Sequence, residues 1–236
     1  MVARWALIAS LSALILATAC GGGQTPPSPT PIVRPTLVPS ATPSNVANPD
    51  DALAHFEAGV ALQAQGNLAG AIAEYGEAIL LNPLDASAFY INRGGIYRNL
   101  GQHQQAIEDY DQAIRLDPQD ASAFYIRGNV YYGLGKYQRA IQDYDEAIRL
   151  DPQFVFAYLT RGLAHRELDQ HIQAVEDYDE AINLAPEFTH AFIARALAHT
   201  ALGNDEEAQQ DVNRAVEFGA IRGRLEDDIE ELKKQR

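Results

Sequence analysis

The chain has 236 residues, of which 18 are basic and 32 acidic, giving a formal net charge of −14. Nucleic-acid-binding proteins gather lysines and arginines on one face, so this acidic balance excludes nucleic acid as a partner. Cys20 is the single cysteine, which excludes an internal disulfide.

Residues 1–20 have the pattern of a targeting segment. Arg4 gives a short positive region and Ala6–Ala17 is apolar, but this run is shorter than the ~20 residues that span a bilayer. Small residues then precede Cys20, whose thiol is a good nucleophile for alkylation. The pattern resembles a bacterial lipoprotein signal, although that signal more often has Leu in the place of Ala17.

The lipoprotein resemblance implies cleavage before Cys20 and a lipid on its sulfur. More than one acyl chain would make such an anchor stable. The protein would then be extracytoplasmic and attached to the bacterial cell membrane. The alternative is an ordinary signal peptide, which would leave the protein secreted or periplasmic.

Residues 21–50 contain eight of the twelve prolines and few apolar side chains. This composition predicts a disordered Pro/Thr/Ser-rich tether without a core of its own. PxxP spacings such as Pro26 to Pro29 would suit a polyproline-binding partner. Stalks of this composition more commonly only hold a domain away from a surface.

From residue 52 the sequence repeats with a period of 34 residues. The repeats are 52–85, 87–120, 121–154, 155–188 and 189–222, and a further amphipathic segment, 223–236, follows them. Each repeat has two apolar runs of helical period around a residue suited to a left-handed helix cap: Gly66, Gly101, Gly135, Asp169 and Gly203. A proline ends each of the first four repeats: Pro83, Pro118, Pro152 and Pro186.

Small and aromatic residues recur at fixed places inside the repeats. The first run has Gly59, Gly94, Gly128, Gly162 and Ala196, and the second has Tyr75, Tyr110, Tyr144 and Tyr178 between paired alanines. Large rings facing small residues allow helices to interdigitate. This series resembles the tetratricopeptide repeat, and the fifth copy departs from it with Val212 for the aromatic residue and Ala220 for the proline. The resemblance implies an all-α fold, a right-handed α-solenoid of about five helix pairs with a C-terminal capping helix over 223–236.

The second repeat is one residue out of register near Asn92, because DASAFYINRGG stands where the third repeat has DASAFYIRGN. The extra residue predicts either a π turn in the first helix of that repeat or a helix that starts one residue later. We favour the later start.

Arginines and acids also recur with the repeat. Arg93, Arg127, Arg161 and Arg195 precede the small residue, and Glu74, Asp109, Asp143, Asp177 and Asp211 adjoin the aromatic site. The first repeat has Ala58 in the arginine position. This predicts that each acid pairs with the arginine of the next repeat: Glu74–Arg93, Asp109–Arg127, Asp143–Arg161 and Asp177–Arg195.

The sequence contains no P-loop, GxSxG or HExxH motif, so we expect a protein that is not an enzyme and has no cofactor. His165 and His199 lie one repeat apart, a helix-packing spacing of ~10 Å. One zinc ion needs ligands at ~2 Å, so we expect no metal site at these histidines.

Superhelical stacking of helix pairs would create a concave groove lined by the first helices. By resemblance, the groove residues are Phe56, Val60, Ile91, Arg98, Asn99, Tyr125, Asn129, Tyr132, Leu159, Leu163, Arg166, Ile193 and Leu197. Apolar residues ringed by Tyr, Arg and Asn suit peptide recognition, although adjacent packing could cover part of this row. Chaperone-binding relatives clamp a C-terminal carboxylate with Lys and Asn, where this chain has Phe56 and Val60, so we expect no such clamp.

Two functions fit the sequence, and neither is catalytic. The favoured one is a lipid-anchored extracytoplasmic scaffold that binds a protein or peptide partner in the groove. The alternative is an envelope binding module for a non-protein ligand such as glycan, with Tyr125 and Tyr132 stacking on a sugar and Asn129 hydrogen-bonding to it.

Overall fold

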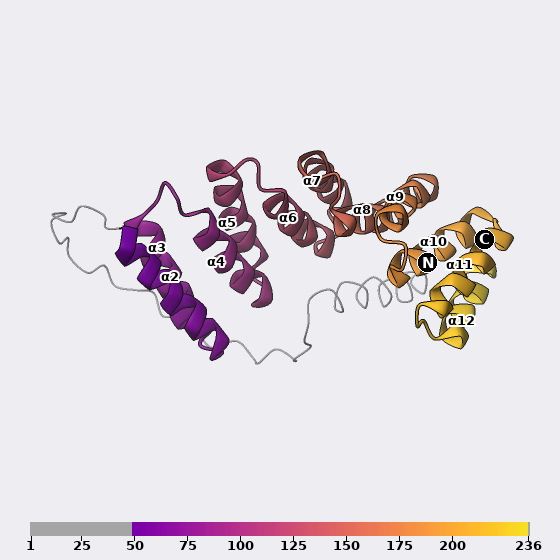
Figure 1. Ribbon diagram of the computed structural model, residues 1–236, viewed down its shortest axis with the longest axis horizontal. Coiled ribbons are helices and arrows are strands. Elements are labelled where there is room, and N and C mark those ends of the chain that lie inside the picture. The colour runs from indigo at the N-terminus through magenta and orange to yellow at the C-terminus, as the bar shows by residue number, and fades with distance from the viewer. Residues whose placement is uncertain (1–48, 236) are drawn as a thin grey trace. The chain divides into compact units, whose positions relative to one another are not determined.

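A computed structural model describes residues 49–235 as eleven α-helices, without a strand in that range (Figure 1). The helices are α2 (Pro49–Ala64), α3 (Leu68–Leu81), α4 (Ser87–Asn99), α5 (His103–Leu116), α6 (Ala121–Gly133), α7 (Tyr137–Leu150), α8 (Val155–Glu167), α9 (His171–Leu184), α10 (Thr189–Leu202), α11 (Asp205–Glu217) and α12 (Arg222–Lys233). The predicted signal peptide, Cys20 and the tether up to residue 48 lie outside the described residues. Within residues 49–235, no helix combines the length and apolarity needed to cross a bilayer.

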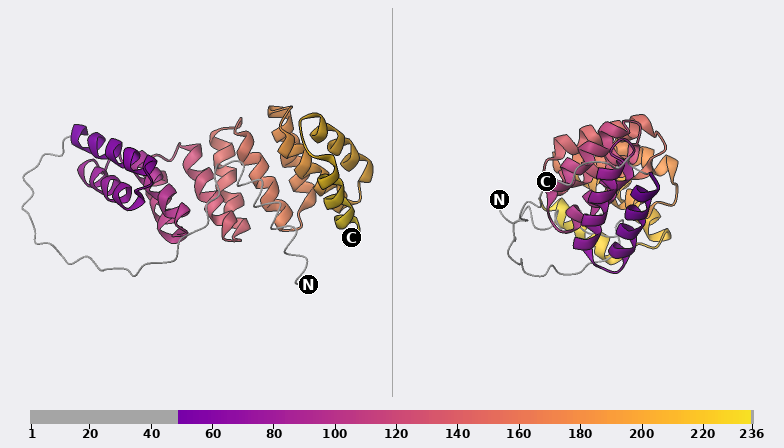
Figure 2. Two further views of the ribbon diagram at one scale, coloured as in Figure 1. Left: turned by 90° about the horizontal axis from the view of Figure 1, so that it is seen from below. Right: turned by 90° about the vertical axis from the view of Figure 1, so that its left-hand side faces the viewer.

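Ten of these helices pack as consecutive pairs, α2 with α3 through α10 with α11, and α12 follows as an extra helix. The all-α prediction of helix pairs with a C-terminal helix is therefore confirmed. The chain divides after Leu116 into two compact units, one containing α2–α5 and the other α6–α12. Figure 2 shows from two further directions how neighbouring pairs stack within a unit, with α3 on α4, α7 on α8 and α9 on α10.

The residue between the two helices of each pair has a left-handed backbone conformation, as predicted. The values of φ are 79° at Gly66, 72° at Gly101, 69° at Gly135, 58° at Asp169 and 84° at Gly203. Asp169 is the only residue other than glycine with a positive φ among the described residues. Aspartate is among the few side chains that tolerate this conformation, so the turn geometry is kept without a glycine.

A tyrosine ring lies directly against a glycine in each of the first four pairs. A Cβ atom added to Gly59, Gly94, Gly128 or Gly162 would lie 2.6, 2.8, 2.7 or 2.5 Å from the Cε1 atom of Tyr75, Tyr110, Tyr144 or Tyr178. Real Cβ contacts are longer than this, so only glycine fits. In the fifth pair the ring is replaced by Val212, and the first helix carries Ala196; both are buried. The small and the large position thus change together.

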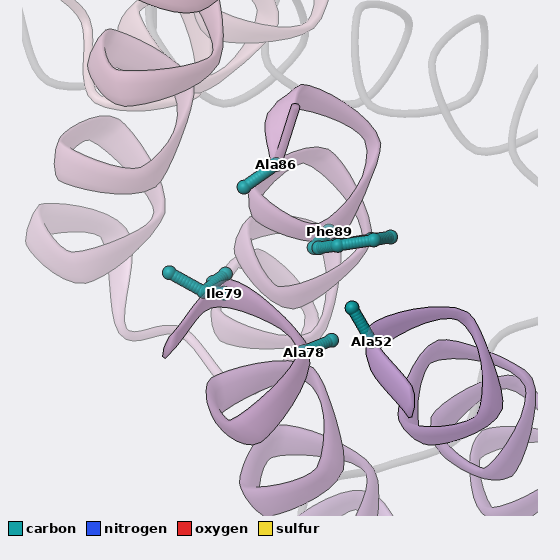
Figure 3. Close-up of a cluster of buried hydrophobic side chains, with 5 residues drawn as sticks. All are labelled: Ala52, Ala78, Ile79, Ala86 and Phe89. Atoms are coloured by element: carbon teal, nitrogen blue, oxygen red, sulfur yellow. The ribbon is translucent and has the colours of Figure 1, made fainter. Parts of the chain in front are cut away.

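The first unit has a core that joins three helices. Ala52 of α2, Ala78 and Ile79 of α3, and Ala86 and Phe89 at the start of α4 are buried together (Figure 3). Phe56 packs against this cluster, with its ring centroid 5.1 Å from that of Phe89 and 5.7 Å from that of Tyr75. The alanines allow α2 and α3 to approach closely enough for these rings to fill the space between them.

The extra residue near Asn92 shifts the start of α4, so the favoured prediction is confirmed. α4 starts at Ser87 and α6 at Ala121, and both helices run without a π turn to Asn99 and Gly133. These starts are 34 residues apart, so the added residue lies in the loop after Pro83. As a result Ala86 caps α4, whereas Asp120 caps α6 and accepts a hydrogen bond from the Ser122 amide.

The predicted pairing of each acid with the arginine of the next repeat was wrong. Each arginine binds the aspartate sixteen residues later in its own pair, through Nη2 and Oδ1 at 2.5–2.7 Å: Arg93–Asp109, Arg127–Asp143, Arg161–Asp177 and Arg195–Asp211. The Nε atom also donates to the same carboxylate in every case. These arginines and aspartates face one another across one helix pair, where the planar guanidinium matches a carboxylate.

A link between consecutive pairs does exist, but it uses another acid. Nη1 of Arg161 binds Asp145 at 2.6 Å, and Nη1 of Arg195 binds Asp179 at 2.5 Å. Each of these acids is two residues beyond the predicted one, a rotation of about 200° around the helix. That rotation turns the side chain away from its own pair and toward the next.

The C-terminal helix α12 packs chiefly on α10 and to a smaller extent on α11. Leu225 and Ile229 of α12 are buried, whereas Ile221 precedes the helix and is exposed. On its polar side, Glu230 binds Lys233 at 2.9 Å and Glu231 binds Lys234 at 3.6 Å. Burial of two apolar residues is enough to cover part of α10.

We expect Gly162→Ala to lower the free energy of unfolding by about 1–3 kcal/mol, because the new methyl group overlaps the Tyr178 ring. Adding Tyr178→Val reproduces the Ala196–Val212 arrangement. The double variant should therefore lose less than the sum of the single variants, by roughly 1 kcal/mol or more in a urea-unfolding cycle.

Gly133→Ala is the matched control, since a Cβ atom there meets nothing within 4 Å. It should be neutral or stabilising by up to about 1 kcal/mol. If the losses of unfolding free energy in Gly162→Ala and Tyr178→Val were additive in the double variant, the Tyr178 ring would not be the reason that position 162 requires glycine.

Candidate functional site

The predicted groove residues all lie on the first helices of the pairs: α2 and α4 in the first unit, and α6, α8 and α10 in the second. The structure divides them into side chains that are packed inside a unit and side chains that reach its surface.

Four of the predicted groove residues in the second unit are buried, namely Tyr132, Leu159, Leu163 and Leu197. Leu163 is fully enclosed and Leu159 is 2% exposed. Helix α8 contacts both α6 and α10, so these neighbouring helices cover its leucines, Leu159 and Leu163. These four residues stabilise the unit and do not line an open surface.

Tyr125 and Asn129 of α6 are half-buried and reach the surface. The ring of Tyr125 lies against Phe154, with the centroids 4.7 Å apart, and against Tyr144 at 5.9 Å. Asn129 accepts a hydrogen bond of 2.8 Å from the Tyr144 hydroxyl through Oδ1. Its amide nitrogen has no partner among the described residues, so it remains a donor at this surface. Ile193 of α10 is also half-buried.

Arg166 belongs to a buried polar cluster on α8. Its Nη2 atom lies 3.2 Å from Oε1 of Glu167, and the two side chains are only 10% and 7% exposed. Burial and the Glu167 carboxylate raise the pKa of Tyr137, whose ring packs edge-on against Tyr132 at 5.3 Å. Burial also raises the pKa of Tyr178 beside Arg166. The Arg166 charge is thus balanced within the protein rather than offered to an anionic ligand.

In the first unit, Phe56 is a core residue, while Val60 is 45% exposed. Ile91 and Arg98 are half-buried and Asn99 is exposed. Of the predicted groove residues in this unit, Val60 is therefore the one exposed apolar side chain on α2, and the predicted residues at the end of α4 are polar. Neither place has the Lys and Asn of a carboxylate clamp.

A cleft that the sequence did not predict opens between α2 and α3. It has a volume of about 410 Å³ and is lined by Asp51, Ala54, His55, Ala58, Glu74 and Leu81. His55 Nδ1 lies 2.6 Å from Glu74 Oε2 across it. The signal was visible in the sequence, since Ala58 and His55 replace the arginine and the aromatic residue of the other repeats, but the resulting space was not.

Two of the other histidines, His165 and His199, make local polar contacts. His165 Nδ1 lies 2.7 Å from Gln170 Oε1, and His199 Nδ1 lies 3.3 Å from the Asn204 amide nitrogen. Among residues 49–235, no group of three His, Cys, Asp or Glu side chains is arranged to hold a metal ion. Burial lowers the pKa of His171 and of His190.

Repeated helix pairs with a Gly–Tyr contact and an Arg–Asp clamp define an α-helical repeat protein, a class built for binding. Family models described as TPR repeat or tetratricopeptide repeat match residues 52–85, 94–135, 121–154 and 157–188, which is more than half of the chain. The chain therefore belongs to the tetratricopeptide repeat proteins. This family forms non-catalytic scaffolds.

Solved structures of other tetratricopeptide repeat proteins are similar to this chain. MamA is 28% identical, with 68% of this chain and 93% of the MamA chain covered and a TM-score of 0.64. YrrB, described as a TPR protein with an unusual peptide-binding site, is 20% identical, with coverages of 73% and 88% and a TM-score of 0.62. PilF of Pseudomonas aeruginosa is 18% identical, with coverages of 75% and 80% and a TM-score of 0.65. YrrB and PilF support the fold alone, and no curated protein matches the chain.

The two shifted histidines predict a loss of stability in mild acid. Because the folded protein binds their protons less readily than the unfolded chain does, stability is complete above the ordinary His pKa of about 6.5 and falls below it. We expect the free energy of unfolding to drop between about pH 7 and pH 5, by less than about 1 kcal/mol for each half-exposed ring. His171→Gln/His190→Gln should flatten this dependence in urea-unfolding curves. An unchanged slope in the double variant would contradict the assignment.

Proposed function

We propose that this protein is a lipid-anchored, extracytoplasmic scaffold that binds a protein or peptide partner through the first helices of its repeats. The observation that carries the binding role is the surface of α6, which the half-buried Tyr125 ring reaches together with Asn129, whose amide nitrogen has no partner among the described residues. An extended peptide offers the matching groups, since its main-chain carbonyls accept hydrogen bonds and its side chains alternate in direction.

The chemistry of this face favours a ligand without a strong charge. Arg166 is neutralised by Glu167, and the Arg161 guanidinium is held by Asp177 and Asp145. The open side chains are aromatic, apolar or amide groups. This supports a partner segment with apolar anchors and main-chain hydrogen bonds rather than a phosphorylated or C-terminal carboxylate group.

YrrB supports the proposal as a protein of the same fold that is described as having a peptide-binding site. The tetratricopeptide repeat is a scaffold, so binding is the activity to be sought. The extracytoplasmic location and the anchor rest on residues 1–20 of the sequence, with Cys20 as the lipidated residue.

A photoreactive phenylalanine analogue at Asn129 should crosslink a defined partner in cells that express the full chain. Asn129 is suited to this because the fourth and fifth repeats carry Leu163 and Leu197 at the equivalent place, so a larger apolar side chain is compatible with the fold. The product is resolved by electrophoresis and identified by mass spectrometry.

Gln142, an exposed residue of α7, is the control position on a second helix. Equal labelling from Gln142 and Asn129 would argue against a specific face. An adduct that glycosidases remove and proteases do not would favour the glycan ligand over a protein.

The lipid anchor has a separate test. Cys20→Ser should release the protein from the membrane fraction into the soluble extracytoplasmic fraction, because serine cannot accept the thioether-linked lipid. Metabolic labelling with a fatty-acid analogue should mark the wild type and not the variant. Unchanged fractionation and labelling would show that Cys20 does not anchor the chain.

A further inference from the structure

Four of the five helix pairs enclose a guanidinium group at the same place. Each arginine lies over the ring of the aromatic residue three positions earlier, at 5.5–5.7 Å, in the pairs Arg93–Tyr90, Arg127–Phe124, Arg161–Tyr158 and Arg195–Phe192. The aspartate sixteen residues later holds the other edge of the group with two or three hydrogen bonds. The repeat therefore builds a binding site for an arginine side chain.

The first pair keeps this site but lacks its arginine. Ala58 stands in the arginine position, Glu74 in the aspartate position and His55 in the aromatic position. All three line the cleft of about 410 Å³ between α2 and α3. The cleft is therefore the space that an arginine side chain fills in the other pairs. Within residues 49–235, Glu74 has only His55 to bind, at 2.6 Å.

The charge of the cleft is not balanced locally. Two carboxylates, Asp51 and Glu74, line it, and the sequence has no lysine or arginine between residues 49 and 92. In the fourth and fifth pairs a second acid, Asp145 or Asp179, also reaches the enclosed guanidinium. In the first pair the second acid at the cleft is Asp51, which comes from α2 itself rather than from a preceding pair.

We propose that this cleft binds the side chain of an arginine from a partner protein. The guanidinium would donate hydrogen bonds to the Glu74 carboxylate, stack on the His55 ring and place its outer edge near Asp51. Arginine fits better than lysine because its planar group pairs with a carboxylate through two parallel bonds and stacks on a ring.

This site is distinct from the proposed groove face. With 100° of rotation per residue, Phe56 and Val60 point roughly 150° or more around the α2 axis from the mean direction of the four α2 residues that line the cleft. A partner can therefore occupy one surface without the other, and failure of one proposal leaves the other standing.

The test uses the full chain in a neutral detergent, with ¹³C-labelled histidine, and a blocked Gly-Arg-Gly peptide as the probe. The peptide should shift the His55 ring signal and saturate in the millimolar range, and the blocked Gly-Lys-Gly peptide should bind at least severalfold more weakly. Glu74→Gln should weaken arginine-peptide binding about fivefold or more, since it removes the charge from the hydrogen bonds. Glu77→Gln changes an exposed residue of the same helix and should leave binding unchanged.

Ala58→Arg supplies the missing side chain from within the protein. We expect it to abolish peptide binding and to raise the urea midpoint of unfolding, a gain that a misfolded variant would not show. Peptide binding that survives Ala58→Arg, or that falls equally in Glu77→Gln and Glu74→Gln, would overturn the proposal in favour of diffuse attraction to an acidic protein. Arg34 belongs to the predicted tether of this chain. Stronger peptide binding by the Arg34→Ala variant would also overturn the proposal, because it would mean that Arg34, and not a partner's arginine, occupies the cleft.

Discussion

The contact between a tyrosine ring and a glycine fixes the distance between the two helices of a pair, and the remaining packing depends on that distance. Because the ring of Tyr144 or Tyr178 occupies the space of a Cβ atom, the helices cannot separate without opening a void or approach further without a clash. At this separation the arginine one position before the glycine meets the aspartate one position before the tyrosine. The buried carboxylate costs free energy, and burial raises the pKa of Asp177 even though the Arg161 guanidinium opposes that shift.

Periodicity predicted the fold well because each signal in it is local. The left-handed turn at Asp169, the small residue against the ring and the late start of α4 follow from spacings within one repeat or its neighbour. The partner of Arg161 did not follow, because Asp143 and Asp177 are both one helix away from it and the sequence gives no measure of their directions. The direction is decided by helix rotation, which turns Asp145 and not Asp143 toward the next pair.

The candidate groove shows a similar limit. Leu159 and Tyr125 hold the same place in consecutive repeats, yet Leu159 is buried and Tyr125 is partly open. The reason is that α8, which carries Leu159, contacts the first helix of the pair on each side of it, α6 and α10, within the second unit. A repeat pattern assigns equal exposure to equivalent positions, whereas exposure depends on what covers each helix. The surface therefore has to be derived from packing, which leaves Tyr125, Asn129 and Ile193 partly open in the second unit and buries Leu159.

Departures from the repeat are informative where the repeat itself is a binding site. Val212 and Ala196 depart together and leave no space, since a smaller side chain on one helix is met by a larger one on the other. Ala58 and His55 also depart together, but their change opens a cleft and leaves Glu74 with His55 as its partner among the described residues. Compensation preserves packing in the fifth pair, whereas the first pair keeps the acid without the guanidinium that the acid binds elsewhere. A carboxylate retained beside an empty arginine position is best explained by a cation that arrives from outside the pair.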